Sequence, residues 1–252
     1  MIRCLLIVLV FLALPVRAAE EVVAGMSQNR ISITANFDGS EILVFGAVKR
    51  EDKIPDGPLD VIVTVQGPST PLIVRHKERR FGIWVNVEEV RFTAAPSFYA
   101  IATTRPLDKV LSATDDLRYK VTIPKAIRVV GTSYATDDPA SYAEAVLRIR
   151  RLNGLYQQRQ GSVDISEQTL FRTEIKLPAN LTEGSYSTRI FLTRGGRVVD
   201  VHESVIEVRK EGLERWFHRM AHEEPWGYAV IALVLAVASG WAASEAFRLM
   251  RS

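Results

Sequence analysis

Cysteine is almost absent from this chain of 252 residues: the single cysteine is Cys4. It lies in the apolar run 4–16, which follows Arg3 and precedes the small residue Ala18, and this pattern predicts a secretory signal peptide over 1–18. An uncleaved N-terminal anchor is the alternative interpretation. A mature chain without cysteine has no disulfides, cysteine-based metal sites or thiol nucleophiles. An exported region without disulfides favours the bacterial periplasm.

Long charge-free runs are also scarce, and the second one closes the chain. Residues 226–244 contain no charged side chain, and Arg248 and Arg251 follow them. A helix of this length reaches about 30 Å, the thickness of a bilayer's hydrocarbon core. We therefore expect a transmembrane helix over 225–247, a cytoplasmic tail over 248–252, and the bulk of the chain in the periplasm at the inner membrane.

Catalytic motifs and a strong charge bias are missing as well. The chain has 32 basic and 29 acidic residues, and the predicted signal removes two of the basic ones, Arg3 and Arg17. A nearly neutral mature protein gives no reason to expect a nucleic-acid partner. No G-x-S-x-G, H-E-x-x-H or glycine-rich phosphate loop occurs. We expect a protein that is not an enzyme and has no cofactor.

Short β-rich runs separated by Gly, Pro, Asn and Asp dominate residues 22–208, which predicts a mainly β fold, an immunoglobulin-like antiparallel sandwich with a helical insertion. One or two modules are compatible with the pattern. The predicted segments are an N-terminal β-sandwich module over 19–105, a helical connecting segment over 106–160 and a C-terminal β module over 161–209.

Two helices are expected in the connecting segment, over 107–117 and from Pro139 onward. The second helix carries Arg148, Arg150 and Arg151 beside its apolar stripe. These arginines form either a solvated face or a basic rim that binds an anion.

A hairpin is predicted around Gly195-Gly196, because glycine adopts the positive φ of type I′ and II′ turns. Pairing outward from the turn predicts three core pairs, Leu192 with Val199, Ile190 with Val201, and Tyr186 with Val205. The face with Arg189 and Phe191 should be mostly solvated. The run Glu183–Tyr186 resembles the tyrosine corner of immunoglobulin-like domains, in which the hydroxyl bonds back to nearby backbone.

An amphipathic helix is expected over 210–224, just before the predicted span. Trp216 and Phe217 lie on its apolar side, and with Trp226 they predict contact with the membrane interface. On its polar side Glu214, His218 and His222 recur every four residues, a spacing that can bind zinc. Membrane-surface packing and a metal site are the two interpretations.

Small residues recur every four positions within the predicted span, at Ala232, Ala236, Gly240 and Ser244. Such a stripe lets a second helix approach closely in lipid. The expected partners are the bilayer and either an integral membrane protein or a second copy of the chain.

Several segments together resemble a known family: Ile31–Thr34, Leu43–Ala47, Leu177–Asn180, Glu183–Tyr186 and the closing apolar run. They are similar to the alphaproteobacterial putative transmembrane protein family. The resemblance implies a signal peptide, a periplasmic region and one C-terminal span, and it implies no chemistry.

The function expected from these patterns is non-enzymatic. We expect a membrane-anchored periplasmic β protein that binds or scaffolds a membrane partner, such as a transporter. The alternative is a periplasmic sensor or carrier of a small anion or a metal.

Overall fold

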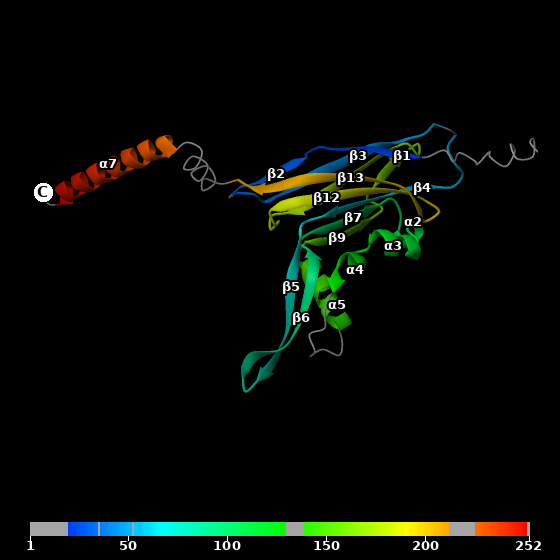
Figure 1. Cartoon of the computed structure of the whole chain (residues 1–252), viewed down its shortest axis with the longest axis horizontal. Coiled ribbons are helices and arrows are strands. Elements are labelled where there is room, and N and C mark those ends of the chain that lie inside the picture. Colours follow the sequence, from blue (N-terminus) through cyan, green and yellow to red (C-terminus); the bar gives the residue numbers. More distant parts are fainter. Residues whose placement is uncertain (1–19, 35, 52, 130–138, 212–224, 251–252) are drawn as a thin grey trace, which may run out of the picture. The chain divides into compact units, whose positions relative to one another are not determined.

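The protein is mainly β, as predicted, and the strands of its described residues form three sheets (Figure 1). The computed structural model describes residues 20–34, 36–51, 53–129, 139–211 and 225–250. The predicted signal peptide, 1–18, and residues 212–224 of the predicted amphipathic helix lie outside this part. The chain divides into two units, one made of residues 1–31 and 38–208 and the other of 32–37 and 209–252.

The first sheet is antiparallel throughout. Its strands, in spatial order, are β1 (Glu21–Met26), β3 (Gly39–Lys49), β11 (Leu170–Pro178) and β10 (Asp164–Ser166). Strand β11 buries every second residue from Phe171 to Leu177. Because side chains alternate between the faces of a strand, this pattern gives the sheet one buried and one solvated face.

The second sheet contains the most deeply buried strands. Its order is β2 (Arg30–Ile33), β13 (Arg197–Lys210), β12 (Gly184–Arg194), β4 (Leu59–Gln66), β7 (Tyr99–Thr103) and β9 (Tyr156–Gln160). Strands β7 and β9 are parallel. Leu59 through Val65 and all of β7 are buried, so both faces of these central strands are covered.

The two predicted β segments, 19–105 and 161–209, pair with each other in both sheets. Strand β3 pairs with β11, and β4 pairs with β12. The apolar alternation of a strand identifies its buried face but not the strand beside it, so these pairings could not be read from the sequence.

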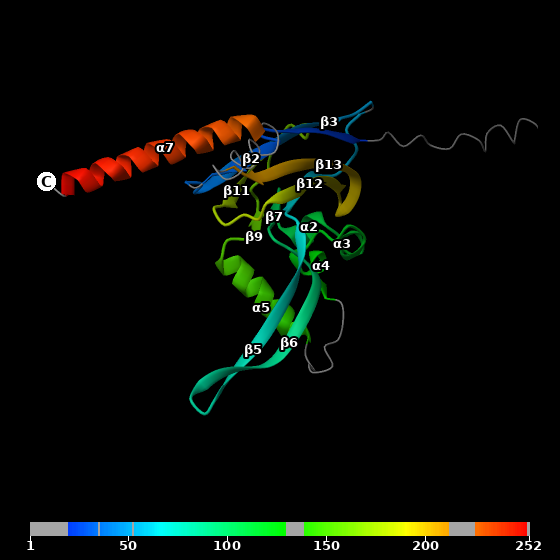
Figure 2. The ribbon, with the colours of Figure 1, turned by 60° about the vertical axis from the view of Figure 1, so that its left-hand side comes forward.

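A long hairpin forms most of the third sheet (Figure 2). Strands β5 (Ser69–Arg80) and β6 (Ile83–Pro96) pair along their lengths, and the two-residue β8 (Arg128–Val129) joins β6 at its inner end. The charged run 75–80 belongs to β5, and His76 within it is exposed.

The connecting segment 106–160 is only partly helical. Its helices are α2 (Leu107–Val110), α3 (Ala113–Tyr119), α4 (Ile123–Ala126) and α5 (Pro139–Leu152), and it ends in strand β9. The single helix expected over 107–117 is interrupted because Leu111 is extended and Ser112 begins α3 as its N-cap, accepting a hydrogen bond from Asp115 N at 3.2 Å.

The β12–β13 hairpin has the predicted turn but a different register. Gly195 and Gly196 both have positive φ, 55° and 78°, as a type I′ turn requires. A bulge after Leu192 then shifts the pairing by one residue, so that Leu192 faces Asp200 rather than Val199. Such a bulge places two residues of one strand opposite one of the other.

The predicted distribution of core residues on this hairpin was therefore wrong on β13. Val199 and Val205 are exposed, whereas Ile206 and Val208 are buried. Phe191, predicted on a solvated face, is buried, because its ring contacts Tyr119 of α3 with the ring centroids 5.7 Å apart.

The C-terminal part of the second unit contains one further helix, α7 (Pro225–Met250). Across the residues that the structure describes, no helix was found to be long and apolar enough to cross a membrane.

Candidate functional site

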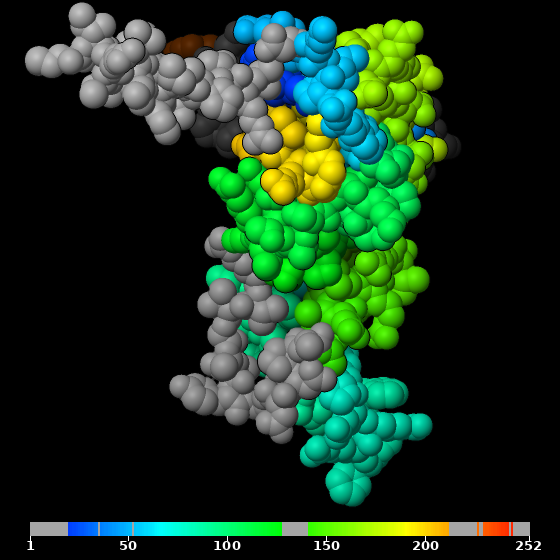
Figure 3. Space-filling model, turned by 90° about the vertical axis from the view of Figure 1, so that its right-hand side faces the viewer, coloured from blue at the N-terminus to red at the C-terminus, as the bar shows by residue number. Residues whose placement is uncertain are grey.

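We call the β5–β6 hairpin the arm, and its outer half is the most exposed β structure in the described chain. Every residue from Arg75 to Asn86 is exposed, on both faces of the ribbon. Figure 3 shows this outer half projecting at the bottom of the view. A two-stranded ribbon with no covered face is marginally stable in water. The outer arm is therefore a candidate surface for an interaction.

The turn at the end of the arm places an aromatic residue in an unfavourable backbone conformation. Phe81 and Gly82 form a two-residue loop with φ of 52° and 84°. Glycine adopts this left-handed region freely, whereas a residue with a side chain loses about 1–2 kcal/mol there. Phe81 is fully exposed, with a relative exposure of 106%, so packing within the fold does not offset this cost.

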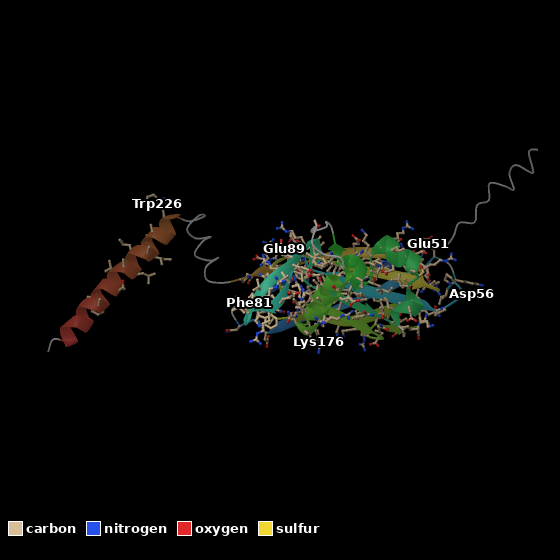
Figure 4. All side chains as sticks on the ribbon, turned by 90° about the horizontal axis from the view of Figure 1, so that it is seen from below. Glu51, Asp56, Phe81, Glu89, Lys176 and Trp226 are labelled. Carbon is tan, nitrogen blue, oxygen red and sulfur yellow. The ribbon has the colours of Figure 1, made fainter. Side chains whose placement is uncertain are left out.

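Apolar side chains surround the turn. Ile83 and Trp84 are each about two-thirds exposed, at 66% and 68%, and Val85 follows at 37%. With Phe81 they place four large apolar side chains in water at one end of the arm. We call residues 79–85 the arm tip; Phe81 marks it in Figure 4, and Glu89 marks the inner part of the arm.

The two faces of the outer arm differ in charge. Arg79 lies opposite Trp84 and Lys77 opposite Asn86, so these four residues share one face, which we call the cation–indole face. The other face carries Glu78 and Arg80, joined by an ion pair of 3.2 Å. Among the described residues, Lys77 and Arg79 form no ion pair, so the cation–indole face carries two positive charges without an acidic partner.

The inner arm, in contrast, is held by the rest of the fold. Val90 is buried, and the Tyr142 hydroxyl of α5 donates a hydrogen bond to Glu88 Oε2. Hydrogen bonds from Arg91, at 3.1 Å, and Arg75, at 3.4 Å, lower the pKa of Glu89. The arm thus has an anchored inner part and a free tip.

A second surface feature is an apolar hollow of 950 Å³ on the solvated face of the first sheet. Val23, Phe45 and Leu170 supply its exposed apolar side chains. Gly25 of β1 lies opposite Phe45 on this face, and a Cβ at Gly25 would come within 3.2 Å of the Phe45 ring. The ion pair between Arg172 and Asp164, at 3.5 Å, closes one side of the hollow.

A buried carboxylate joins the two large sheets. Glu20 precedes β1, and its side chain is 4% exposed. Arg50 Nε donates to Glu20 Oε1 at 2.6 Å, and Arg194 of β12 donates to both carboxylate oxygens at 2.8 Å. These two guanidinium groups, Arg194 first, lower the pKa of Glu20 against the opposing effect of burial. The Glu20 carboxylate is thus fully engaged by the guanidinium groups of Arg50 and Arg194, and this cluster has a structural role.

The three arginines predicted as an anion-binding rim are not brought together. Arg148 and Arg151 line a hollow of 590 Å³ on α5, together with the carboxylate of Glu144. Arg150 instead faces the fold and donates to the Ser97 carbonyl at 3.3 Å. Residues three and four apart on a helix share a face, so Arg148 and Arg151 are neighbours and Arg150 is not.

The residues predicted to act at the membrane are only partly described. Trp226, Ala232, Ala236 and Gly240 lie on α7 and are exposed, and a Cβ added at Gly240 would meet no atom within 4 Å. Ser244 belongs to the same helix, but its side chain lies outside the described part. The remaining predicted residues, Glu214, Trp216, Phe217, His218 and His222, lie outside the described residues altogether.

The described ranges contain no group of three or more His, Cys, Asp or Glu side chains that could hold a metal ion. His202 is half-buried on β13, and its neighbours in sequence are engaged elsewhere: Asp200 Oδ2 accepts from Val22 N at 2.7 Å, and Ser204 contacts the Met26 sulfur.

The arm tip was not among the sites predicted from the sequence. The signal was present in the hexapeptide from Arg79 to Trp84, in which two arginines precede Phe-Gly-Ile-Trp. The two strands of a hairpin cannot cover an aromatic side chain that lies in its two-residue turn. Recognising this requires knowing that no other element covers the turn.

Comparison with known protein families identifies the family of this chain. Residues 21–249 match the family described as Putative transmembrane protein (Alph_Pro_TM). The chain belongs to this family. Membership in Alph_Pro_TM confirms the resemblance seen in the sequence and implies association with a membrane. No curated protein matches the chain.

Proposed function

We propose that this member of the Alph_Pro_TM family is a non-enzymatic protein of the inner membrane, anchored by the segment 225–247 with its β region in the periplasm, and that it binds an integral membrane partner. The observation that carries the proposal is the apolar surface of α7, which belongs to a chain of a transmembrane family.

Large apolar side chains of α7 are exposed. Those that are at least 60% exposed are Trp226, Val230, Leu233, Val234, Val237 and Trp241. An apolar surface of this kind is unfavourable in water and favourable in hydrocarbon. Twenty-six helical residues extend about 39 Å, more than the bilayer's hydrocarbon core.

The small-residue stripe supports a partner within the membrane. Ala232, Ala236 and Gly240 are exposed on α7, and the space around Gly240 is open. Small residues at this spacing allow close approach of another helix, and van der Waals packing then replaces the hydrophobic drive that lipid removes. A transmembrane helix of the partner would pack against this stripe.

We further propose that the β region is an immunoglobulin-like sandwich. The order β1-β3-β11-β10 in one sheet and β2-β13-β12-β4-β7 in the other resembles the arrangement of strands A-B-E-D and A′-G-F-C-C′. The Tyr186 hydroxyl donates to the Thr182 carbonyl at 2.8 Å near the start of β12, in the position of the tyrosine corner.

Affinity purification of the full-length protein from mild detergent tests the proposal. We expect an integral membrane partner at reproducible stoichiometry with the wild type and with Val237→Leu, a control on the same helix outside the stripe. We expect Gly240→Leu to lose that partner, because its side chain fills the space for the second helix. Failure to recover any membrane protein reproducibly would count against the proposal.

A role in sensing or carrying an anion or a metal is the second candidate, and Arg148 and Arg151 are its strongest support. The carboxylate of Glu144 lines the same hollow and opposes an anion there. A thermal-shift screen of the full-length protein with anions and metals tests this candidate, and no shift with any of them would remove it.

A further inference from the structure

We propose that the arm tip, residues 79–85, binds the surface of a membrane that carries anionic lipid headgroups. This contact is separate from the α7 anchor and does not depend on it. The proposal combines three features of the tip: exposed aromatic side chains, unpaired cations on the same face, and a turn residue held in an unfavourable conformation.

The aromatic side chains suit the interfacial zone of a bilayer. Phe81 is fully exposed, and Trp84 is 68% exposed beside it. Tryptophan is enriched at membrane–water interfaces, where its ring lies at the headgroup level. Interfacial segments bury their apolar side about 5–10 Å deep. A strand advances about 3.3 Å per residue, so this depth takes in the turn and its flanking residues.

The two cationic side chains lie on the face of the arm that carries Trp84, within reach of lipid headgroups when Trp84 is at the interface. On the cation–indole face, Arg79 is opposite Trp84, and Lys77 follows two residues farther from the turn. The acid of the outer arm, Glu78, lies on the opposite face and is paired with Arg80. Phosphate groups of anionic lipids would supply the negative charge that Arg79 and Lys77 do not receive from the described chain.

The conformation of Phe81 argues that this side chain is retained for contact with something outside the fold. Asparagine or glycine would occupy the turn more easily. Strained residues that persist without internal packing point to functional positions. The charge complementarity and the transmembrane family favour a lipid surface as the contact over a protein pocket or a second copy.

The experiment uses the full-length protein with Val85→Cys in a Cys4→Ser background, labelled with an environment-sensitive NBD fluorophore. It is reconstituted into vesicles of phosphatidylcholine alone or of phosphatidylcholine mixed with phosphatidylglycerol. Nitroxide lipids report contact with the acyl chains by quenching. The matched label position is Ile73→Cys on the same strand pair, roughly 20 Å farther from the turn along the arm.

We expect the label at position 85 to shift to the blue and to be quenched in the anionic vesicles, and the label at position 73 to stay in water. Lys77→Gln and Arg79→Gln should each lower the ratio of bound to free tip about fivefold, and high salt should lower it further. Lys109→Gln, a change of an exposed lysine on α2, should leave it unchanged. Phe81→Ser combined with Trp84→Ser should abolish quenching.

Three results would overturn the proposal. The label could remain in water in anionic vesicles, as in the zwitterionic ones. The blue shift could appear only as the protein concentration rises, which would show that the tip contacts a second copy of the chain. The blue shift could appear only after a native membrane extract is added, which would show that the tip contacts a protein partner.

Discussion

Replacing Glu20 with glutamine removes the negative charge between Arg50 and Arg194 and keeps the shape of the side chain. The carboxylate is 4% exposed, and the two arginine side chains are 10% and 11% exposed. In the variant, the amide's NH₂ group would face a guanidinium donor, and two buried cations would lose their counterion. The change therefore tests whether this cluster holds the two large sheets together.

The expected loss is large because the pairing is buried and bidentate. Removing one partner of a buried ion pair lowers the free energy of unfolding by about 3–5 kcal/mol. For a domain of this size, each kcal/mol lowers Tm by about 2–4 °C, so we expect Glu20→Gln to lower Tm by about 6–20 °C.

The pH dependence follows from the lowered pKa of Glu20. The ordinary glutamate pKa is about 4.3 in the unfolded chain. A lowered folded-state pKa gives stability that is complete above the unfolded value and is lost as the pH falls through the folded value. The difference between wild type and Glu20→Gln should thus be constant near pH 7 and should shrink below about pH 4.

The assay is thermal unfolding of the full-length protein in mild detergent, followed by the β signal in circular dichroism. Mass spectrometry of the N-terminus checks processing, because Glu20 lies close to the predicted cleavage site. The control is Glu21→Gln, whose partner Lys49 lies at 3.3 Å with both side chains 60% exposed. An exposed pair contributes about 0–1 kcal/mol. Equal Tm values for the two variants would refute the reasoning.

Three further changes are measured by urea unfolding of the same protein. Asp60→Asn should lower the free energy of unfolding by about 1.5–3 kcal/mol, because Asp60 is 1% exposed and accepts from Arg105 Nε at 2.8 Å; an unchanged midpoint would contradict this. Tyr186→Phe should lower it by about 1 kcal/mol through loss of the hydrogen bond to Thr182, and no loss would show that the corner adds nothing to stability. Phe81→Asn should raise it by about 1 kcal/mol by relieving the positive φ, whereas destabilisation would mean that Phe81 packs within the fold.

The hairpin at Gly195-Gly196 illustrates how far local pattern predicts structure. The turn was predicted correctly, since two adjacent glycines favour positive φ at both positions. The register was wrong by one residue because of the bulge after Leu192. Phe191 was placed on the wrong kind of face because α3, distant in sequence, covers that side of β12.

The candidate functional surfaces also include some that the sequence predicts and some that only the structure reveals. The closing apolar run and its small-residue stripe were evident in the sequence and carry the proposed function. The arm tip was not, because the exposure of Phe81 depends on which elements cover the hairpin. The predicted basic rim is divided for a related reason: α5 turns Arg150 toward the Ser97 carbonyl and away from Arg148 and Arg151.

The sequence by itself determined the β character, the tight turn at Gly195-Gly196 and the family, because alternation, glycine conformation and apolar runs are properties of neighbouring residues. Only the tertiary structure decided that strands on either side of 106–160 share both large sheets, that Glu20 meets Arg194, and that the arm ends in uncovered aromatic side chains. These features depend on contacts between residues far apart in the chain, and no local pattern specifies which distant segment a strand or a charge will meet.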